Sequence, residues 1–242
     1  MIKPPQLDYR ALTAELFIVF IGLFLALQVD EWRENRELDE SEVRYLHRLK
    51  DDLQAFVEFS ERFLVGREKN RAAVQHVSDS FAAGQIIAKD HRKFELGLIY
   101  VGHLPDLRLQ KSSYDEMVAS GMFARLRSEE LKTAIAELYA THEQIQRNFS
   151  WWRNSTNELF SQLQQYVGPY SEEKPVSDGA RMVEATVRRV EFDFEELQGE
   201  PSIRNGFFWA ADTHNDWIRM TRELLRITEE AISILESELS KR

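Results

Sequence analysis

The chain has 242 residues, no cysteine, and a formal net charge of −10 from 31 basic and 41 acidic residues. The lack of cysteine excludes disulfides, thiol catalysis and cysteine-based zinc sites, and the acidic balance argues against nucleic acid as a partner, because binding to phosphates needs a basic face. With only 10 glycines and 6 prolines, the composition favours helices over a turn-rich β fold.

The first predicted element is an apolar transmembrane helix over residues 12–29. This stretch of 18 residues is interrupted only by Thr13, Glu15 and Gln28. At about 1.5 Å per residue it is roughly 27 Å long, close to the ~30 Å hydrocarbon layer of a bilayer. A buried core helix and a cleaved export signal are the alternatives, but no small-residue cleavage pattern follows the run. We therefore expect an uncleaved anchor in the lipid bilayer, preceded by a short cytoplasmic N-terminus, residues 1–11.

Charged residues follow the apolar run with no proline or glycine between them. The anchor helix is therefore expected to continue into water as an acidic helical stalk over residues 30–42, which holds seven acidic residues and two arginines. The positive-inside rule counts Lys and Arg, and by that count the two flanks are nearly even. Because the N-terminal segment is so short, we favour a cytoplasmic N-terminus and a periplasmic main domain at a bacterial inner membrane.

Three polar or interfacial residues mark the ends of the predicted span. Glu15 lies near the first end, where a charge costs less than at the bilayer centre, and it is interpreted as interfacial, with Arg10 as one possible ion-pair partner. Gln28 and Trp32 mirror it at the other end, and Trp suits the membrane interface. The alternative interpretation makes Glu15 a protonatable or ion-pairing group between helices.

Residues 43–242 are predicted to fold as an antiparallel helical bundle, so that the whole chain is all-α. Apolar residues recur at spacings of three and four over most of this region, as in helices that bury one face. The expected elements are helices over 43–66, ended or bent at Gly66, and 67–83, capped by Gly84; a short apolar segment over 94–104; a helix capped by Ser112 or Ser113 and ended by Gly121; a helix from Ser128 to Gly168; a loop over 170–179; a helix over 180–197; and a last helix from about 207 to 239.

The last helix has the clearest pattern. Its apolar seam runs from Phe207 to Leu239 in steps of four and three, and apolar residues beside the seam widen it. That width suits a helical bundle better than a two-stranded coiled coil. His214 lies on the seam and is interpreted as a hydrogen-bonded core histidine, with Thr221 or a neighbouring helix as its partner.

One stretch near the start, ELFIVFIGLFLALQVDEW, combines a Glu, an apolar run with one Gly, an Ala-Leu-Gln and a Trp. It resembles the start of an uncharacterised family of bacterial single-pass membrane proteins, a domain of unknown function. One departure is Asp30-Glu31, where family members often carry two asparagines. The resemblance implies an anchored helical protein and brings no known activity. The matching positions are Glu15, Gly22, Ala26, Leu27, Gln28 and Trp32, then Tyr45, Leu46, Leu49, Asp52 and Leu53, with a looser likeness over residues 113–139.

No catalytic motif is found: the sequence has no nucleophile elbow, P-loop, Gly-rich dinucleotide turn or HExxH. The six histidines do not form the converging pairs that a zinc or di-iron site needs. We therefore expect no enzyme activity, no cofactor and no metal. Trp151, Trp152 and Arg153 are the candidate residues for partner contact, because Trp and Arg dominate binding hot spots; the alternative places one Trp in the core and one half-exposed.

The expected function is a membrane-anchored module for protein–protein contact or scaffolding, either as a homo-oligomer or with another membrane protein. Two alternatives stay open. One is a periplasmic ligand-sensing bundle, for which Thr221, Thr228 and His214 are the seam candidates. The other is an ion-coupled membrane oligomer in which Glu15 carries the proton.

Overall fold

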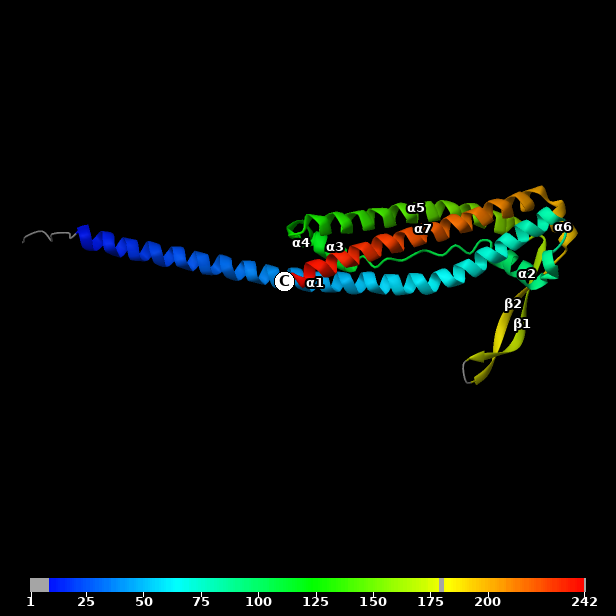
Figure 1. The fold of residues 1–242 in the computed structure, drawn as a ribbon, viewed down its shortest axis with the longest axis horizontal. Helices are drawn as coiled ribbons and strands as arrows, with labels where there is room; N and C mark the ends of the chain where they lie inside the picture. Colours follow the sequence, from blue (N-terminus) through cyan, green and yellow to red (C-terminus); the bar gives the residue numbers. More distant parts are fainter. Residues whose placement is uncertain (1–8, 179–180, 242) are drawn as a thin grey trace, which may run out of the picture.

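The computed structural model describes residues 9–178 and 181–241, with side chains except those of residues 9–16, 18, 19, 35, 169–178 and 181–188. The elements in chain order are α1 (Tyr9–Ala83), the 3-10 helix η1 (Ile87–Lys89), α2 (His91–Tyr100), α3 (Ser112–Ala119), α4 (Met122–Arg125), α5 (Glu129–Leu163), β1 (Val167–Asp178), β2 (Arg181–Phe192), α6 (Phe194–Gly199) and α7 (Pro201–Ser240). The helices α1, α5 and α7 form an elongated bundle, and the first part of α1 projects beyond it as a single helix (Figure 1).

The helix α1 runs without interruption from the apolar N-terminal run through the stalk to Ala83. This continuity confirms the predicted helical connection between the apolar run and residues 30–42. Gly66 was predicted to end or bend the helix, and an end at this residue is wrong. A lone glycine costs a helix only about 1 kcal/mol, and the packing of α1 on α7 offsets that cost. Gly84, at φ +70°, ends the helix as predicted, and its N–H donates to the carbonyl of Phe81 at 3.3 Å.

The structure does not support the predicted membrane span. Among the described residues, no helix contains a stretch that is long and apolar enough to cross a membrane. The side chain of Glu15 and those of most of residues 12–19 lie outside the described residues.

The direction of the long helices differs from a simple antiparallel bundle. The helix α7 runs antiparallel to α1, as shown by ion pairs of Glu68 with Arg222 and of Lys50 with Glu236. The helix α5 runs parallel to α1, because residues 101–111 return along the bundle before α5 begins (Figure 1). The predicted antiparallel arrangement therefore holds for α7 against α1 and α5, and not for α1 against α5.

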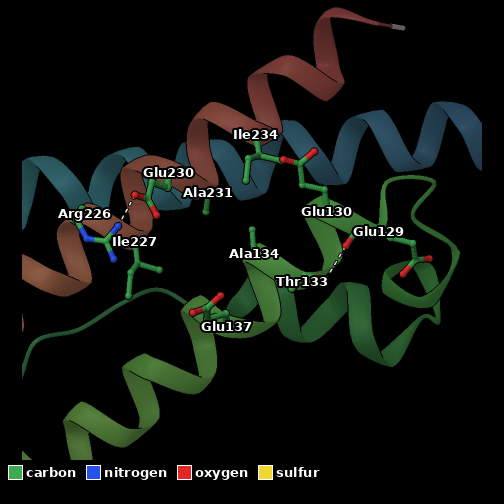
Figure 2. Close-up of a pocket in the computed structure, with 10 residues that line it drawn as sticks. All are labelled: Glu129, Glu130, Thr133, Ala134, Glu137, Arg226, Ile227, Glu230, Ala231 and Ile234. Carbon is green, nitrogen blue, oxygen red and sulfur yellow. Dashed lines mark hydrogen bonds and ion pairs between the residues drawn. The ribbon is translucent and has the colours of Figure 1, made fainter.

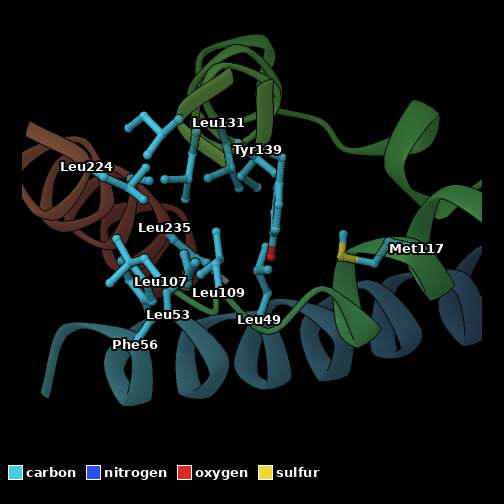
Figure 3. Packing of buried hydrophobic residues seen from close by; sticks show 14 of the residues in the cluster. Leu49, Leu53, Phe56, Leu107, Leu109, Met117, Leu131, Tyr139, Leu224 and Leu235 are labelled. Atoms are coloured by element: carbon cyan, nitrogen blue, oxygen red, sulfur yellow. The ribbon is translucent and has the colours of Figure 1, made fainter. Parts of the chain in front are cut away.

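The core lies along the inner faces of the three long helices. Its larger part joins α1, α5 and α7 to residues 104–109, with Leu49, Leu53, Leu107 and Leu235 among the buried side chains (Figure 3). A second cluster at the far end joins α1 and α7 to α2, α6 and the base of the hairpin. The predicted seam of the last helix is confirmed, since Phe207, Ala211, His214, Ile218, Thr221, Leu225, Thr228 and Leu235 are buried.

A β-hairpin occupies residues 167–192, where a loop and a helix were predicted. The strands β1 and β2 pair antiparallel, with Val167 opposite Phe192 and Asp178 opposite Arg181. The helix predicted over 180–197 is therefore wrong except for the short α6. The β2 sequence is rich in β-branched residues, which favour strands, but its valines are also spaced as on a helix face. The all-α prediction holds for the bundle and fails for this hairpin.

A buried ion pair ties the hairpin to α2. Glu95 is only 5% exposed and accepts two hydrogen bonds from the guanidinium of Arg189, at 2.7 and 2.8 Å. Arg92 donates a third bond at 2.6 Å. Burial would raise the pKa of Glu95, but the hydrogen bonds from the two arginines outweigh burial and lower it. The Glu95 carboxylate is therefore charged at neutral pH, as this arrangement requires.

Two helix starts test the capping predictions. Ser128 caps α5 as predicted, because its hydroxyl accepts from the N–H of Leu131 at 3.2 Å. The predicted cap at Ser112 or Ser113 is wrong: α3 begins at Ser112 itself, and the residue before it, Lys111, makes no side-chain cap. Serine is also a common residue inside the first helical turn, so its presence alone could not identify the cap.

Gly97 is expected to be essential where α2 packs on α1. A Cβ at Gly97 would clash with the carbonyl oxygen of Ala73 and with a methyl group of Val77. Gly97→Ala should therefore lower the free energy of unfolding by about 1–3 kcal/mol, although alanine is the better helix former. Gly66→Ala is the matched control: apart from its own stretch of helix backbone, no atom is found within 4 Å of its Cβ position, so we expect a gain of about 1 kcal/mol. Urea unfolding measures both, and shifts of the same sign would contradict this account.

Candidate functional site

The central feature of the bundle is an irregular segment, residues 101–111, which begins with a turn at Val101 and Gly102 and which we call the clamped segment. It runs between α1 and α5 and has no strand beside it (Figure 1). Leu104, Leu107 and Leu109 point into the core and are at most 5% exposed. Because no ladder satisfies its backbone, the buried carbonyls of this segment need other hydrogen-bond donors.

Side chains of the three long helices supply those donors. From α1, Arg67 donates to the carbonyl of His103 at 2.7 Å. From α7, His214 Nε2 lies 3.1 Å from the carbonyl of Val101. Three further bonds come from α5: Arg153 to Leu104 at 3.0 Å, His142 to Leu107 at 3.1 Å and Tyr139 to Gln110 at 3.2 Å.

His214 was predicted to be a bonded core histidine, and its burial and hydrogen bond confirm this. Its partner is the carbonyl of Val101 rather than Thr221, whose hydroxyl donates to the carbonyl of Trp217 at 2.9 Å. A carbonyl only accepts, so Nε2 carries the proton of a neutral imidazole. Burial, together with the smaller effect of the nearby charge of Arg67, lowers the pKa of His214 to about 4.

A pocket of about 590 Å³ lies beside the clamped segment, and we call it the arginine pocket. Its aromatic wall is Phe59 and Phe63 of α1, whose rings stack with centroids 5.3 Å apart. Arg153 pairs with Asp106 across the pocket. The pocket is lined by Phe59, Phe63, Gly102, His103, Leu104, Pro105, Asp106, Arg108 and Arg153.

A second hollow of about 440 Å³, the acidic groove, lies between α5 and α7 (Figure 2). Its floor is apolar, and its lining contains four glutamates and one arginine. That arginine, Arg226, is hydrogen-bonded to Glu223 and Glu230. Among the residues the structure covers, neither Glu130 nor Glu137 has an ion-pair partner. The groove is lined by Glu129, Glu130, Thr133, Ala134, Glu137, Arg226, Ile227, Glu230, Ala231 and Ile234.

The acidic groove opens where the stalk enters the bundle. Arg127, just before α5, pairs with Asp39 of the stalk, and its backbone N–H donates to Glu42 at 3.3 Å. The acidic stalk and the acidic groove therefore lie at the same end of the bundle. A partner that contacts both meets negative charge over an apolar floor.

The residues predicted for partner contact have separate environments. Trp151 is 67% exposed on the outer face of α5. Trp152 is half-buried against Phe149, with ring centroids 5.8 Å apart. Arg153 is engaged by the clamped segment and Asp106. These three neighbours in sequence therefore do not form one shared surface.

The residues predicted for the membrane interface lie on the projecting part of α1. Trp32 is 61% exposed, and the guanidinium of Arg36 lies 5.7 Å from the centroid of its ring. Gln28 is exposed as well. The side chain of Glu15 lies outside the described residues, and neither its interfacial interpretation nor its proposed proton-carrying role is tested.

Arg67 and Arg108 were not among the residues predicted for a site. Arg67 follows Phe56 and Phe63 at helical spacing on the core face of α1, and a charged residue at such a position is a signal that could have been used. Arg108 lies in an extended segment whose place in the fold no local pattern reveals. The seam threonines offer little to a ligand, because Thr221 and Thr228 donate to carbonyls of their own helix.

A family model described as a family of unknown function matches residues 15–167, which is more than half of the chain. The match begins at Glu15, where the resemblance noted in the sequence begins. It supplies neither an activity nor a membrane location. No curated protein and no solved structure matches the chain.

Proposed function

The chain belongs to this family of unknown function, DUF6090, and we propose that it is a membrane-anchored, non-enzymatic helical protein that binds another protein at its acidic groove. The observation that carries the proposal is the projecting part of α1. Its described apolar side chains from Phe17 to Val29 are 40–66% exposed, and none of the described elements packs on them.

An exposed apolar run of this kind needs a cover, and a lipid bilayer fits best. The exposed side chains point in every direction around the helix, whereas a protein groove would cover one face. The whole run over residues 12–29 has 18 residues with one charged group. In this arrangement the N-terminus lies in the cytoplasm and the bundle stands in the periplasm, with the stalk and acidic groove nearest the membrane.

Charge decides between the candidate partners. A second copy aligned beside the first would bring two stalks together, each with seven acidic residues and two arginines over residues 30–42. The like charges of two adjacent stalks repel each other. The seam of α7, which could have formed a coiled coil between copies, is buried within the chain. A basic amphipathic helix of another membrane protein complements both the acidic rim and the apolar floor of the groove.

Photocrosslinking in native membranes tests the proposal. The full chain carries a benzoylphenylalanine in place of Thr133, which is exposed in the groove, and the membranes are washed with carbonate before irradiation. We expect the chain to stay in the membrane pellet and to form an adduct with a Lys- and Arg-rich segment of another protein. The double variant Glu130→Lys, Glu137→Lys should lower the adduct yield at least fivefold.

The matched control is Glu158→Lys, a charge reversal at an exposed position of α5 outside the groove, which should leave the yield unchanged. Release of the chain by carbonate would disprove the anchor. An adduct with a second copy, or with a segment that lacks basic residues, would disprove the proposed partner. Equal yields in the double variant and the control would exclude the groove as the contact.

A further inference from the structure

Arg67 is a buried cation without a counterion. Its side chain is on the core face of α1 and the residue is 8% exposed. One guanidinium nitrogen donates to the carbonyl of His103, and the buried Nε has no hydrogen-bond partner within the described parts of the chain. Among the residues that the structure describes, no carboxylate pairs with Arg67. A buried charge that lacks a partner of opposite sign costs several kcal/mol.

The charge of Arg67 acts on the arginine pocket. Arg67 follows Phe63 by one helical turn on α1, and its guanidinium lies 5.1 Å from the centroid of the Phe63 ring in the pocket wall. Its hydrogen-bond acceptor, the His103 carbonyl, belongs to another residue of the pocket lining. Since the group is buried, it supplies a positive potential through a low-dielectric wall rather than a direct contact.

Two more arginines make this pocket positive in a strongly acidic protein. Arg153 is balanced by Asp106, but Arg108 is exposed on the rim and has no ion-pair partner within the described part of the chain. The pocket lining therefore holds two guanidinium groups and one carboxylate, Asp106, and the buried charge of Arg67 behind the wall adds to the positive side. The adjoining wall is aromatic, and Phe59 keeps 42% of its surface exposed.

We propose that the arginine pocket binds a small aromatic carboxylate. A planar ring can pack on Phe59 and Phe63, because aromatic rings attract one another when their centroids are about 4.5–7 Å apart. The carboxylate can then accept a bidentate hydrogen bond from the guanidinium of Arg108. The buried charge of Arg67, behind the pocket wall, stabilises the bound carboxylate. The volume of about 590 Å³ is that of a small-molecule site. This site differs from the acidic groove in charge and position, so it stands independently of the proposed function.

Calorimetric titration of the full chain in dodecylmaltoside with 1-naphthoate tests the inference. We expect saturable one-to-one binding, and 1-naphthylmethylammonium, with the same ring and opposite charge, should bind at least tenfold more weakly. Arg108→Glu and Phe59→Ala alter exposed side chains and should not disturb folding. Each should weaken naphthoate binding, the first by at least tenfold.

Arg62→Glu is the matched control, because Arg62 is exposed on the same turn of α1 and does not line the pocket. Its affinity for naphthoate should stay within twofold of the unchanged chain. The inference is overturned if naphthoate shows no saturable binding up to its solubility, if the naphthyl cation binds equally well, or if Arg108→Glu and Arg62→Glu give the same affinity.

Discussion

Trp217→Ala is expected to lower the free energy of unfolding by about 3–5 kcal/mol, the range for removing a large aromatic side chain from a packed core. Trp217 is 1% exposed. Its ring stacks on Phe149 with centroids 5.1 Å apart and tilts against Phe63 at 5.3 Å. It therefore joins α7 to both α5 and α1, and no single neighbour can move to fill the space it leaves.

The expected loss comes from packing rather than from hydrogen bonding. The Nε1 of Trp217 is buried and has no hydrogen-bond partner among the described side chains and backbone, so removal of the ring breaks no hydrogen bond there and relieves one unsatisfied donor. Trp217→Phe should for that reason cost much less than Trp217→Ala, because it keeps most of the ring contact and also removes the unpaired N–H.

Trp209→Ala is the control for this prediction. Trp209 lies two turns earlier on α7 and is 65% exposed, so its loss should change the free energy of unfolding by no more than about 0.5 kcal/mol. Urea unfolding of the full chain in detergent, followed by far-ultraviolet circular dichroism, measures all three variants. Equal losses for Trp209→Ala and Trp217→Ala would show that α7 is not packed as described.

Local periodicity was enough to predict the seam of α7. The steps of four and three from Phe207 to Leu235 are a property of the helix itself, and a helix with that stripe buries it. The same reasoning failed in β2, where Val183, Val187 and Val190 are spaced as on a helix face. Their β-branched side chains favour a strand equally well, and the choice depends on pairing with β1, which no local pattern encodes.

The clamped segment and both hollows could not be predicted, because distant parts of the chain assemble them. The bond from His214 to Val101 joins residues 113 positions apart, and that from His142 to Leu107 joins residues 35 apart. The acidic groove combines α5 with α7, and the arginine pocket combines α1, α5 and the clamped segment. The sequence lists the residues that form these features, but it does not show which distant residues they contact in the fold.

The stability of the bundle is expected to fall by about 3 kcal/mol through His214 alone as the pH falls from about 6.5 to about 4. In the folded chain the pKa of His214 is lowered to about 4, chiefly by burial and to a smaller extent by Arg67 and His103, which together outweigh the raising effect of the hydrogen bond to the carbonyl of Val101. In the unfolded chain the pKa is about 6.5. Below that value the unfolded state binds a proton that the folded state does not, so stability is lost at about 1.4 kcal/mol per pH unit.

His214→Gln isolates this contribution, because glutamine does not titrate and its amide can still donate to the carbonyl of Val101. The pKa of His142 is also lowered, chiefly by burial, and the carboxylates titrate in both proteins, so both lose stability in acid. We therefore expect the difference in free energy of unfolding between the unchanged chain and His214→Gln to be constant above pH 7. Between pH 6.5 and pH 4 the unchanged chain should lose about 3 kcal/mol more than the variant. Parallel curves across that range would show that His214 keeps an ordinary pKa in the folded chain, and that the carbonyl of Val101 is not held by a buried neutral imidazole.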